Sequence, residues 1–190
     1  MVARARQIEI EISVVELIED YGLGIYPTSL GMVMDTLQID RISYSSLDDN
    51  EKRLAVLASQ DKAFNVTSHD YLRAQVVFDD TRGSYFFRSR FSGGHETAHI
   101  WLEHEEDTPN REAEADYFSG YLLAPHPLII TMENPSVAEV SERFGISGEC
   151  AAIAINQANA RRHEGSPWRP HEKWLLENIQ WKGGGLSGRP

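Results

Sequence analysis

Hydrophobic residues recur at helical intervals along most of the chain, with charged residues between them. In the first such segment, Ile8, Ile12, Val15 and Ile18 are separated by glutamates and followed by glycines that end a helix. Patterns of this kind predict helices over residues 8–20, 27–37, 49–59, about 83–104 and 112–124.

Two adjacent glycines, Gly93 and Gly94, lie inside the predicted helix over residues 83–104. Each weakens a helix by roughly 1 kcal/mol relative to alanine. We therefore expect another backbone to pack closely at this point, although the pattern does not say which one.

Shorter segments suit strands. Alternation at Ile42 and Tyr44 predicts a short strand within residues 40–47. Residues 60–70 are polar and mixed, which predicts a loop.

The most strand-like run, Ala74–Phe78, lies within residues 72–78 and is followed by a predicted turn at residues 79–83. A strand in this place could form a sheet edge that pairs with an extended peptide, or it could only cover the core. The sequence favours neither role.

Composition limits the fold and the partners. The chain has 190 residues, 41% of them hydrophobic, which is enough for one compact domain with small additions. Together with the pattern above, this indicates a mostly helical α+β fold. The 29 acidic and 18 basic residues give a net charge of -11, which argues against direct nucleic-acid binding because phosphate contacts need lysine and arginine.

No targeting or membrane segment is expected. The apolar residues near the N-terminus are interrupted by glutamates, unlike a signal-peptide core, and no run approaches the roughly 18 apolar residues of a membrane span. Cys150 is the only cysteine, which excludes an internal disulfide and fits a reducing compartment. We expect a cytoplasmic protein without a membrane partner.

The segment His95-Glu96-Thr97-Ala98-His99 reads H-E-x-x-H. Residues four apart share a helix face, so His95 and His99 can direct both imidazoles at one Zn²⁺. Glu96 can then act as the general base toward a water at the metal. The motif also occurs by chance, so it requires a third ligand elsewhere in the chain.

We expect the third ligand from the helix over residues 112–124. Glu112 and Asp116 are four residues apart, so Glu112 can bind zinc while Asp116 accepts the free ring N–H of a ligand histidine. Glu114 is the alternative ligand, but it lies about 200° around the helix from Glu112 and is expected to face solvent.

Other polar side chains are candidates for supporting roles. His104 follows His99 by five residues, without the glycine or the spacing of a metzincin site, and is expected at the surface or behind a ligand. Tyr117, Tyr121 and His126 are candidates for stabilising an oxyanion, although we expect each to be structural.

These residues resemble the ImmA/IrrE family of zinc metallopeptidases over about Ala74–Pro125. The resembling segments are Arg90-Phe91-Ser92, His95–His99, Glu112–Phe118 and Leu122–Pro125. The chain departs from the family pattern at small positions without loss of a ligand, with Ala98 for glycine, Asp116 for asparagine, Ser119 for alanine and Ala124 for methionine. Residues 137–147 also resemble the family's small helical region and the first helix and turn of a helix-turn-helix.

The resemblance implies a zincin-like core with a small β-sheet beside the H-E-x-x-H helix and a gluzincin-type zinc site. We expect an N-terminal helical and mixed region over residues 1–70 and a catalytic core over 71–132. A small helical region over 133–163 and a partly disordered tail over 164–190, with a short helix near 171–180, would follow.

The resemblance further implies a metalloendopeptidase that cleaves a helix-turn-helix repressor and so derepresses mobile-element or stress genes. Three alternatives stay open: a non-catalytic zincin-like protein that binds a repressor, a DNA-binding protein that uses residues 136–162, and a metallohydrolase with another substrate.

Overall fold

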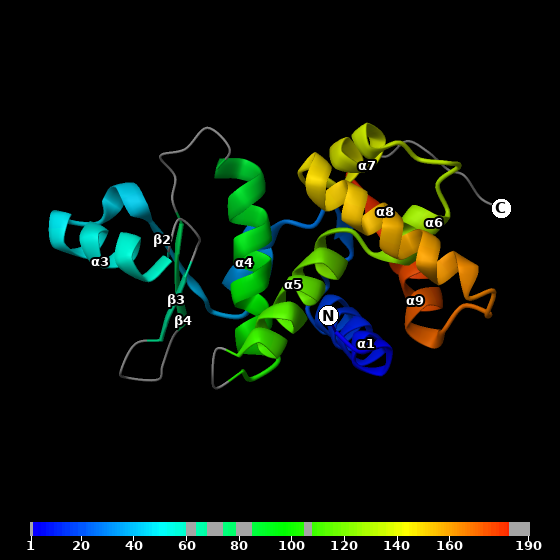
Figure 1. The fold of residues 1–190 in the computed structure, drawn as a ribbon, viewed down its shortest axis with the longest axis horizontal. Coiled ribbons are helices and arrows are strands. Elements are labelled where there is room, and N and C mark those ends of the chain that lie inside the picture. Colours follow the sequence, from blue (N-terminus) through cyan, green and yellow to red (C-terminus); the bar gives the residue numbers. More distant parts are fainter. Residues whose placement is uncertain (1, 60–63, 68–73, 79–84, 105–107, 183–190) are drawn as a thin grey trace.

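The computed structural model describes residues 2–59, 64–67, 74–78, 85–104 and 108–182. Its helices and two small sheets confirm the mostly helical α+β class (Figure 1). The elements in chain order are α1 (Arg4–Asp20), β1 (Ile25–Tyr26), α2 (Leu30–Thr36), β2 (Asp40–Ser43), the short 3-10 helix η1 (Tyr44–Ser46), α3 (Asp49–Ser59), β3 (Phe64–Thr67), β4 (Ala74–Phe78), α4 (Tyr85–Trp101), α5 (Pro109–Leu123), α6 (His126–Ile130), α7 (Val137–Phe144), α8 (Gly148–His163), α9 (Pro170–Asn178) and β5 (Gln180–Trp181).

The larger sheet has the strand order β2-β4-β3, with β2 parallel and β3 antiparallel to β4. β4 is therefore the central strand, and the interpretation of this segment as a possible edge strand is wrong. The predicted loop over residues 60–70 is also wrong where Phe64–Thr67 forms β3, because four residues of alternating character are held in a strand by pairing with β4. The predicted turn at residues 79–83 lies outside the described residues.

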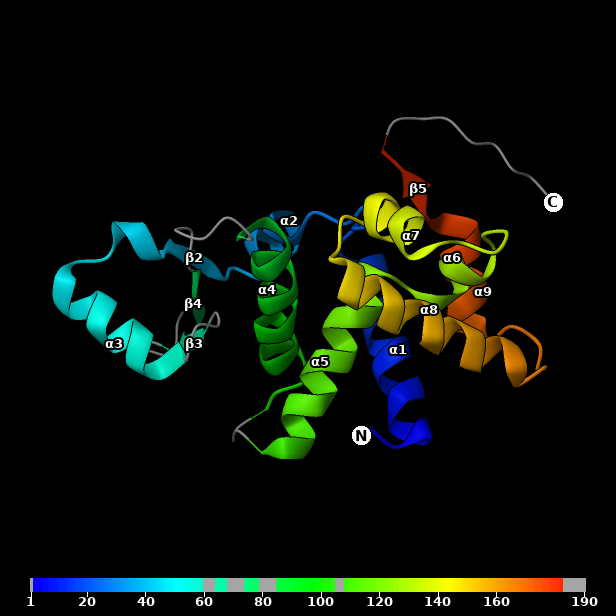
Figure 2. The same cartoon turned by 45° about the horizontal axis from the view of Figure 1, so that its top comes forward.

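The sheet separates α3 from the rest of the molecule. α3 lies on one side of it and α4 on the other, and α4 then packs against α5 (Figures 1 and 2). α1 packs on α5 and α9, while α6 and α7 pack on α8. The motif helix α4 therefore stands between the sheet and the helical part of the molecule.

The helical part has its own core and its own small sheet. β1 pairs in parallel with β5, so Tyr26 lies beside Trp181 near the other end of the chain. The core includes Ile10, Leu17, Tyr26, Phe118, Leu122, Phe144 and Leu175, all fully buried. Among the described residues, no helix is both long and apolar enough to cross a membrane.

α7 and α8 form the predicted helix and turn followed by a second helix. Ser136 and Glu139 make a capping box at the start of α7, and Gly145 ends it with φ of 63° in the left-handed region. Ser147 then caps α8. Arg90 of α4 donates hydrogen bonds to the carbonyl oxygens of Gly145 and Phe144, which ties this unit to the motif helix.

α4 and α5 approach each other closely at Gly94. A Cβ built on Gly94 would lie 2.5 Å from the Oγ of Ser119 and 3.2 Å from its Cβ. The Ser119 hydroxyl also donates a hydrogen bond of 2.8 Å to the carbonyl oxygen of Phe91. The close backbone expected at the paired glycines is thus α5, and the small side chain at Ser119 lets the helices approach.

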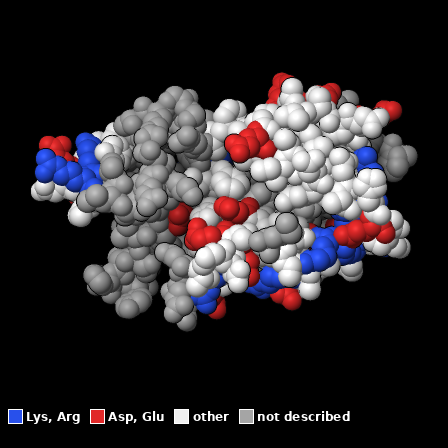
Figure 3. All heavy atoms as spheres, in the orientation of Figure 1, with Lys and Arg blue, Asp and Glu red and all other residues white. Residues whose placement is uncertain are grey.

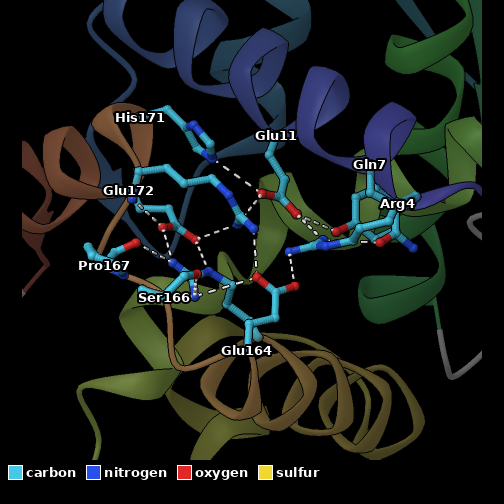
Figure 4. A network of polar contacts seen from close by, with 11 residues as sticks. Arg4, Gln7, Glu11, Glu164, Ser166, Pro167, His171 and Glu172 are labelled. Carbon is cyan, nitrogen blue, oxygen red and sulfur yellow. Dashed lines mark hydrogen bonds and ion pairs between the residues drawn. The ribbon is translucent and has the colours of Figure 1, made fainter.

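A network of buried charges joins α1, α8 and α9 (Figure 4). Glu11 accepts hydrogen bonds from Tyr117 at 2.7 Å and from Arg4 at 3.1 Å, and its other oxygen lies 3.2 Å from His171 Nε2. Glu172 pairs with two nitrogens of Arg161 at 2.6 and 2.7 Å. Because buried carboxylates are costly without partners, this network determines how the two ends of the chain pack together.

We predict that Gly94→Ala destabilises the fold, although alanine favours a helix more than glycine does. The added Cβ meets Ser119, and such overpacking costs about 1–3 kcal/mol. Gly120→Ala on α5 is the matched control, because its Cβ would meet nothing within 4 Å and the helix should gain about 1 kcal/mol. Urea denaturation of both variants measures the difference, and equal stabilisation of the two would contradict the close crossing.

We also predict acid destabilisation through Glu11. Burial raises the pKa of this carboxyl, but hydrogen bonds from His171 and Tyr117 outweigh burial and lower the pKa to about 2 from 4.5. A lowered folded pKa gives stability that is present above the unfolded value and is lost as the pH falls from 4.5 toward 2. This shift corresponds to roughly 3 kcal/mol.

The test compares melting temperatures of wild type and Glu11→Gln between about pH 6 and about pH 3. The variant should be less stable near pH 6, and the difference should shrink on acidification. Glu9→Gln, at an exposed carboxylate of the same helix, should follow wild type throughout. A difference between Glu11→Gln and wild type that does not change with pH would contradict the role of this carboxylate.

Candidate metal centre

α4 presents two histidines one turn apart on one face. The Nε2 atoms of His95 and His99 lie 3.0 Å from each other, and both side chains are largely buried. The helical spacing of the H-E-x-x-H segment therefore brings the two rings to one point.

α5 brings Glu112 to the same point. Thr108 caps this helix and Pro109 occupies its first turn, so the helix begins one turn before Glu112. The carboxylate oxygens of Glu112 lie 3.3 Å from Nε2 of His95 and 3.2 Å from Nε2 of His99. The three donor groups of His95, His99 and Glu112 thus form one compact cluster.

The separations of these donor atoms suit a zinc ion. Zinc bonds of about 2.0–2.2 Å in a tetrahedron place neighbouring donors about 3.3–3.6 Å apart, close to the separations found here. The two Nε2 atoms lie 3.0 Å apart, and one oxygen of Glu112 lies 3.2 Å from His99 Nε2 while its other oxygen lies 3.3 Å from His95 Nε2. Two imidazoles and one carboxylate are also the donor types that zinc accepts in hydrolytic sites, so the residues fit a Zn²⁺ ion.

Asp116 lies behind the first histidine. Its Oδ1 is 2.9 Å from Nδ1 of His95, and because a carboxylate only accepts, Nδ1 donates and Nε2 keeps its lone pair. Burial lowers the pKa of His95, but the hydrogen bond and charge of Asp116, with the charges of Glu96 and Glu112, outweigh it and raise the pKa overall. Asp116 therefore orients His95 in the manner expected from the four-residue spacing to Glu112.

Glu96 follows His95 directly and is buried. Its negative charge acts on His95, which places the carboxylate within electrostatic reach of the donor cluster. On the other side the cluster is more open, since the side chains of Glu112 and Asp116 are 45% and 61% exposed. Figure 3 shows acidic side chains gathered near the middle of this face, over α4 and α5.

Glu114 does not face solvent, contrary to the expectation from helical geometry. Its side chain is 18% exposed and accepts two hydrogen bonds from Arg6 of α1, at 2.9 and 2.7 Å. These bonds outweigh the effect of burial and lower the pKa of Glu114. The alternative third ligand thus points away from Glu112 and toward a helix that is remote in sequence.

His104 is buried rather than at the surface. Its side chain is 4% exposed, and its Nδ1 lies 3.1 Å from Nδ1 of His99, on the side of that ring that faces away from Glu112. Its Nε2 lies 3.5 Å from the carboxylate of Glu114. Burial is the main cause that lowers the pKa of His104, which favours a neutral ring.

The way in which α4 ends explains why His104 lies against His99. The predicted helix over residues 83–104 ends at Trp101, because Glu103 adopts φ of 54° and reverses the chain. The amides of His104 and Glu103 donate to the carbonyl oxygens of His99 and Ile100, at 2.9 and 3.3 Å. This is a Schellman motif, which brings the residue after the left-handed position back over the last turn. The start predicted at residue 83 lies outside the described residues.

The tyrosines and the histidine considered for an oxyanion lie on the other side of α5. Tyr117 donates to Glu11, and His126 contacts Gln157 at 3.0 Å. Tyr121 is 1% exposed and packs edge-on against His126. Their contacts are those of core residues, in agreement with the structural role expected for each.

A second group of possible metal ligands, Glu11, His171 and Glu172, lies in the buried network of Figure 4. Arg4 and Arg161 already pair with these carboxylates. A divalent cation would add charge where guanidinium groups already balance the acids, so this cluster does not suit a metal.

A comparison with protein families gives one match. The model of the Peptidase M78 family, described as the IrrE N-terminal-like domain, matches residues 50–156. The matched stretch exceeds half of the chain and runs from α3 into α8, including the whole donor cluster. No curated protein and no solved structure matched the chain.

Proposed function

Because the chain belongs to the Peptidase M78 family with its IrrE N-terminal-like domain, we propose that it is a zinc-dependent metalloendopeptidase. One observation carries this proposal. The Nε2 atoms of His95 and His99 and the carboxylate of Glu112 converge within 3.3 Å of one another, beside the buried Glu96.

In the proposed mechanism His95, His99 and Glu112 hold the zinc ion, and Asp116 orients His95. Zinc, when bound, activates a water and polarises the scissile carbonyl. Glu96 takes the proton of the attacking water and delivers it to the leaving amine. Glu96 is suited to this role because it is buried, follows the ligand His95 directly, and acts on that ring through its charge.

We further propose that the substrate is a helix-turn-helix repressor, as the resemblance to ImmA/IrrE proteins implies. Cleavage of a repressor would place the protein in the cytoplasm and make it an anti-repressor of mobile-element or stress genes.

Contacts within the chain support a protein substrate over nucleic acid as the partner. The basic side chains of the α7–α8 unit already have partners inside the protein. Arg143 stacks on Trp181, Arg161 pairs with Glu172, and Arg162 donates to the carbonyl oxygen of Ile130.

We predict about one zinc ion per chain in the purified wild-type protein, because its donor set matches a catalytic zinc site. His99→Ala and Glu112→Ala each remove one donor and should leave the protein folded with little zinc. Glu142→Ala is the control, because it removes an exposed carboxylate outside the cluster. Elemental analysis with circular dichroism measures both properties, and full zinc content in Glu112→Ala would exclude this residue as the third ligand.

We predict that Glu96→Gln abolishes cleavage while zinc stays bound. The amide keeps the shape of the side chain but cannot take a proton, and loss of such a base costs about 10²- to 10⁴-fold in rate. The assay uses a helix-turn-helix repressor encoded beside the gene, with and without a chelator. Cleavage by wild type that the chelator does not affect would reject the metal mechanism, and binding without cleavage would favour a non-catalytic regulator.

A further inference from the structure

The ligand His99 has a ring neighbour outside the donor cluster. His104 Nδ1 lies 3.1 Å from His99 Nδ1, while His99 Nε2 faces His95 and Glu112. The two nitrogens of His99 therefore have different surroundings, one among the donors and one against a buried imidazole.

The proposed zinc site determines where the protons lie. A neutral imidazole carries one proton, so a His99 ring that offers its Nε2 lone pair to a metal carries its proton on Nδ1. The atom opposite that proton is Nδ1 of His104, which must then be an acceptor. The proton of His104 is consequently on Nε2, which faces the carboxylate of Glu114 at 3.5 Å.

The three residues His99, His104 and Glu114 form a series of neighbouring side chains, and the carboxylate of Glu114 at its end is itself held in place. Arg6 donates to Glu114 through Nε and Nη2 at 2.9 and 2.7 Å, a two-point contact between α1 and α5. Each partner in the series thus has the hydrogen-bonding character that its neighbour needs. The carboxylate of Glu114 faces Nε2 of His104 at 3.5 Å, a charge contact longer than a hydrogen bond, and two guanidinium N–H groups of Arg6 fix that carboxylate.

On this basis, and resting on the proposed zinc site, we propose that His104 is a positioning residue for the metal: it accepts the Nδ1–H of His99 and is itself oriented by Glu114 and Arg6. Outer partners of this kind fix the tautomer and the ring orientation of a metal ligand. The two histidine ligands are then supported differently. His95 contacts the exposed Asp116, whereas His99 contacts the buried His104, behind which lie Glu114 and the partly exposed Arg6 of α1.

The backbone supplies a second argument. The residues that meet across a Schellman motif are usually apolar, whereas here they are His99 and His104. The reversal at Glu103 uses a left-handed conformation that disfavours residues other than glycine, so it has a local cost of roughly 1 kcal/mol. The polar contact that this reversal creates is the contact of His104 with His99, a proposed zinc ligand.

Two substitutions of His104 separate positioning from packing. His104→Phe keeps the ring but removes the acceptor, whereas His104→Asn retains an acceptor oxygen near the position of Nδ1 and loses volume. If His104 positions His99, zinc affinity falls by about 10- to 100-fold in His104→Phe and less in His104→Asn. If His104 only fills space, the order reverses, because the smaller side chain leaves a cavity.

Arg6 offers a matched pair of carboxylates, since it contacts both Glu114 and the exposed Glu9. We expect Glu114→Gln to weaken zinc binding several-fold and Glu9→Gln to leave it unchanged. An equal response of the two variants would show that Arg6 acts only through general charge, and complete loss of zinc in Glu114→Gln with retention in Glu112→Ala would make Glu114 the ligand. Either result overturns the proposed positioning by Glu114.

The measurement is zinc affinity of the full chain by competition with a chelator, together with ¹⁵N spectra of the histidine rings in the zinc-loaded protein. We expect His104 to carry its proton on Nε2. A proton on its Nδ1, or wild-type affinity in His104→Phe, would overturn the inference while leaving the zinc site intact. Failure of the wild-type chain to bind zinc would instead reject the proposed function.

Discussion

The close crossing of α4 and α5 is the constraint on which the candidate site depends. Both histidines come from α4, but the carboxylate that completes the donor triangle and the one that orients His95 come from α5. At Gly94 the two helices approach so closely that a Cβ would not fit beside Ser119. Wider spacing at this point would withdraw Glu112 from the histidines without changing any residue of the H-E-x-x-H motif.

α1 supports the site from outside the residues that carry the motif. It contributes Arg6 to the carboxylate behind His104, and Glu11 to the tyrosine on the opposite face of α5. α5 is thereby held by polar contacts on two sides, in addition to its apolar packing. The family match begins at residue 50, so this support comes from a part of the chain that the match does not cover.

The sequence was most informative where function and regular geometry coincide. Four-residue spacing on a helix predicted that His95 and His99 share a face and that Glu112 and Asp116 share another, and the structure brings these faces together. For Glu114 the same reasoning was only half right. Helical angles correctly indicated that its side chain points away from Glu112, but the expected exposure to solvent was wrong. The side chain meets Arg6, whose approach depends on tertiary packing.

Two other differences have similar causes. β4 was recognised as a strand, but its central position depends on pairing with segments on both sides. One of these, Phe64–Thr67, is too short for its alternation to predict a strand without its partner. His104 was noticed for its distance from His99, which does not fit a helix face. It comes back over His99 only because Glu103 reverses the chain, and a left-handed glutamate is not a recognisable stop signal.

The contact between Glu11 and His171 has a consequence for the order in which the chain can fold. These residues are 160 positions apart, and β1 likewise finds its partner strand only near residue 180. During synthesis α1 leaves the ribosome before α9, so its buried carboxylate has no complete set of partners until α9 has followed. Until then α5 remains without part of the support that α1 gives it, so correct assembly of the helical part is tied to the arrival of α9.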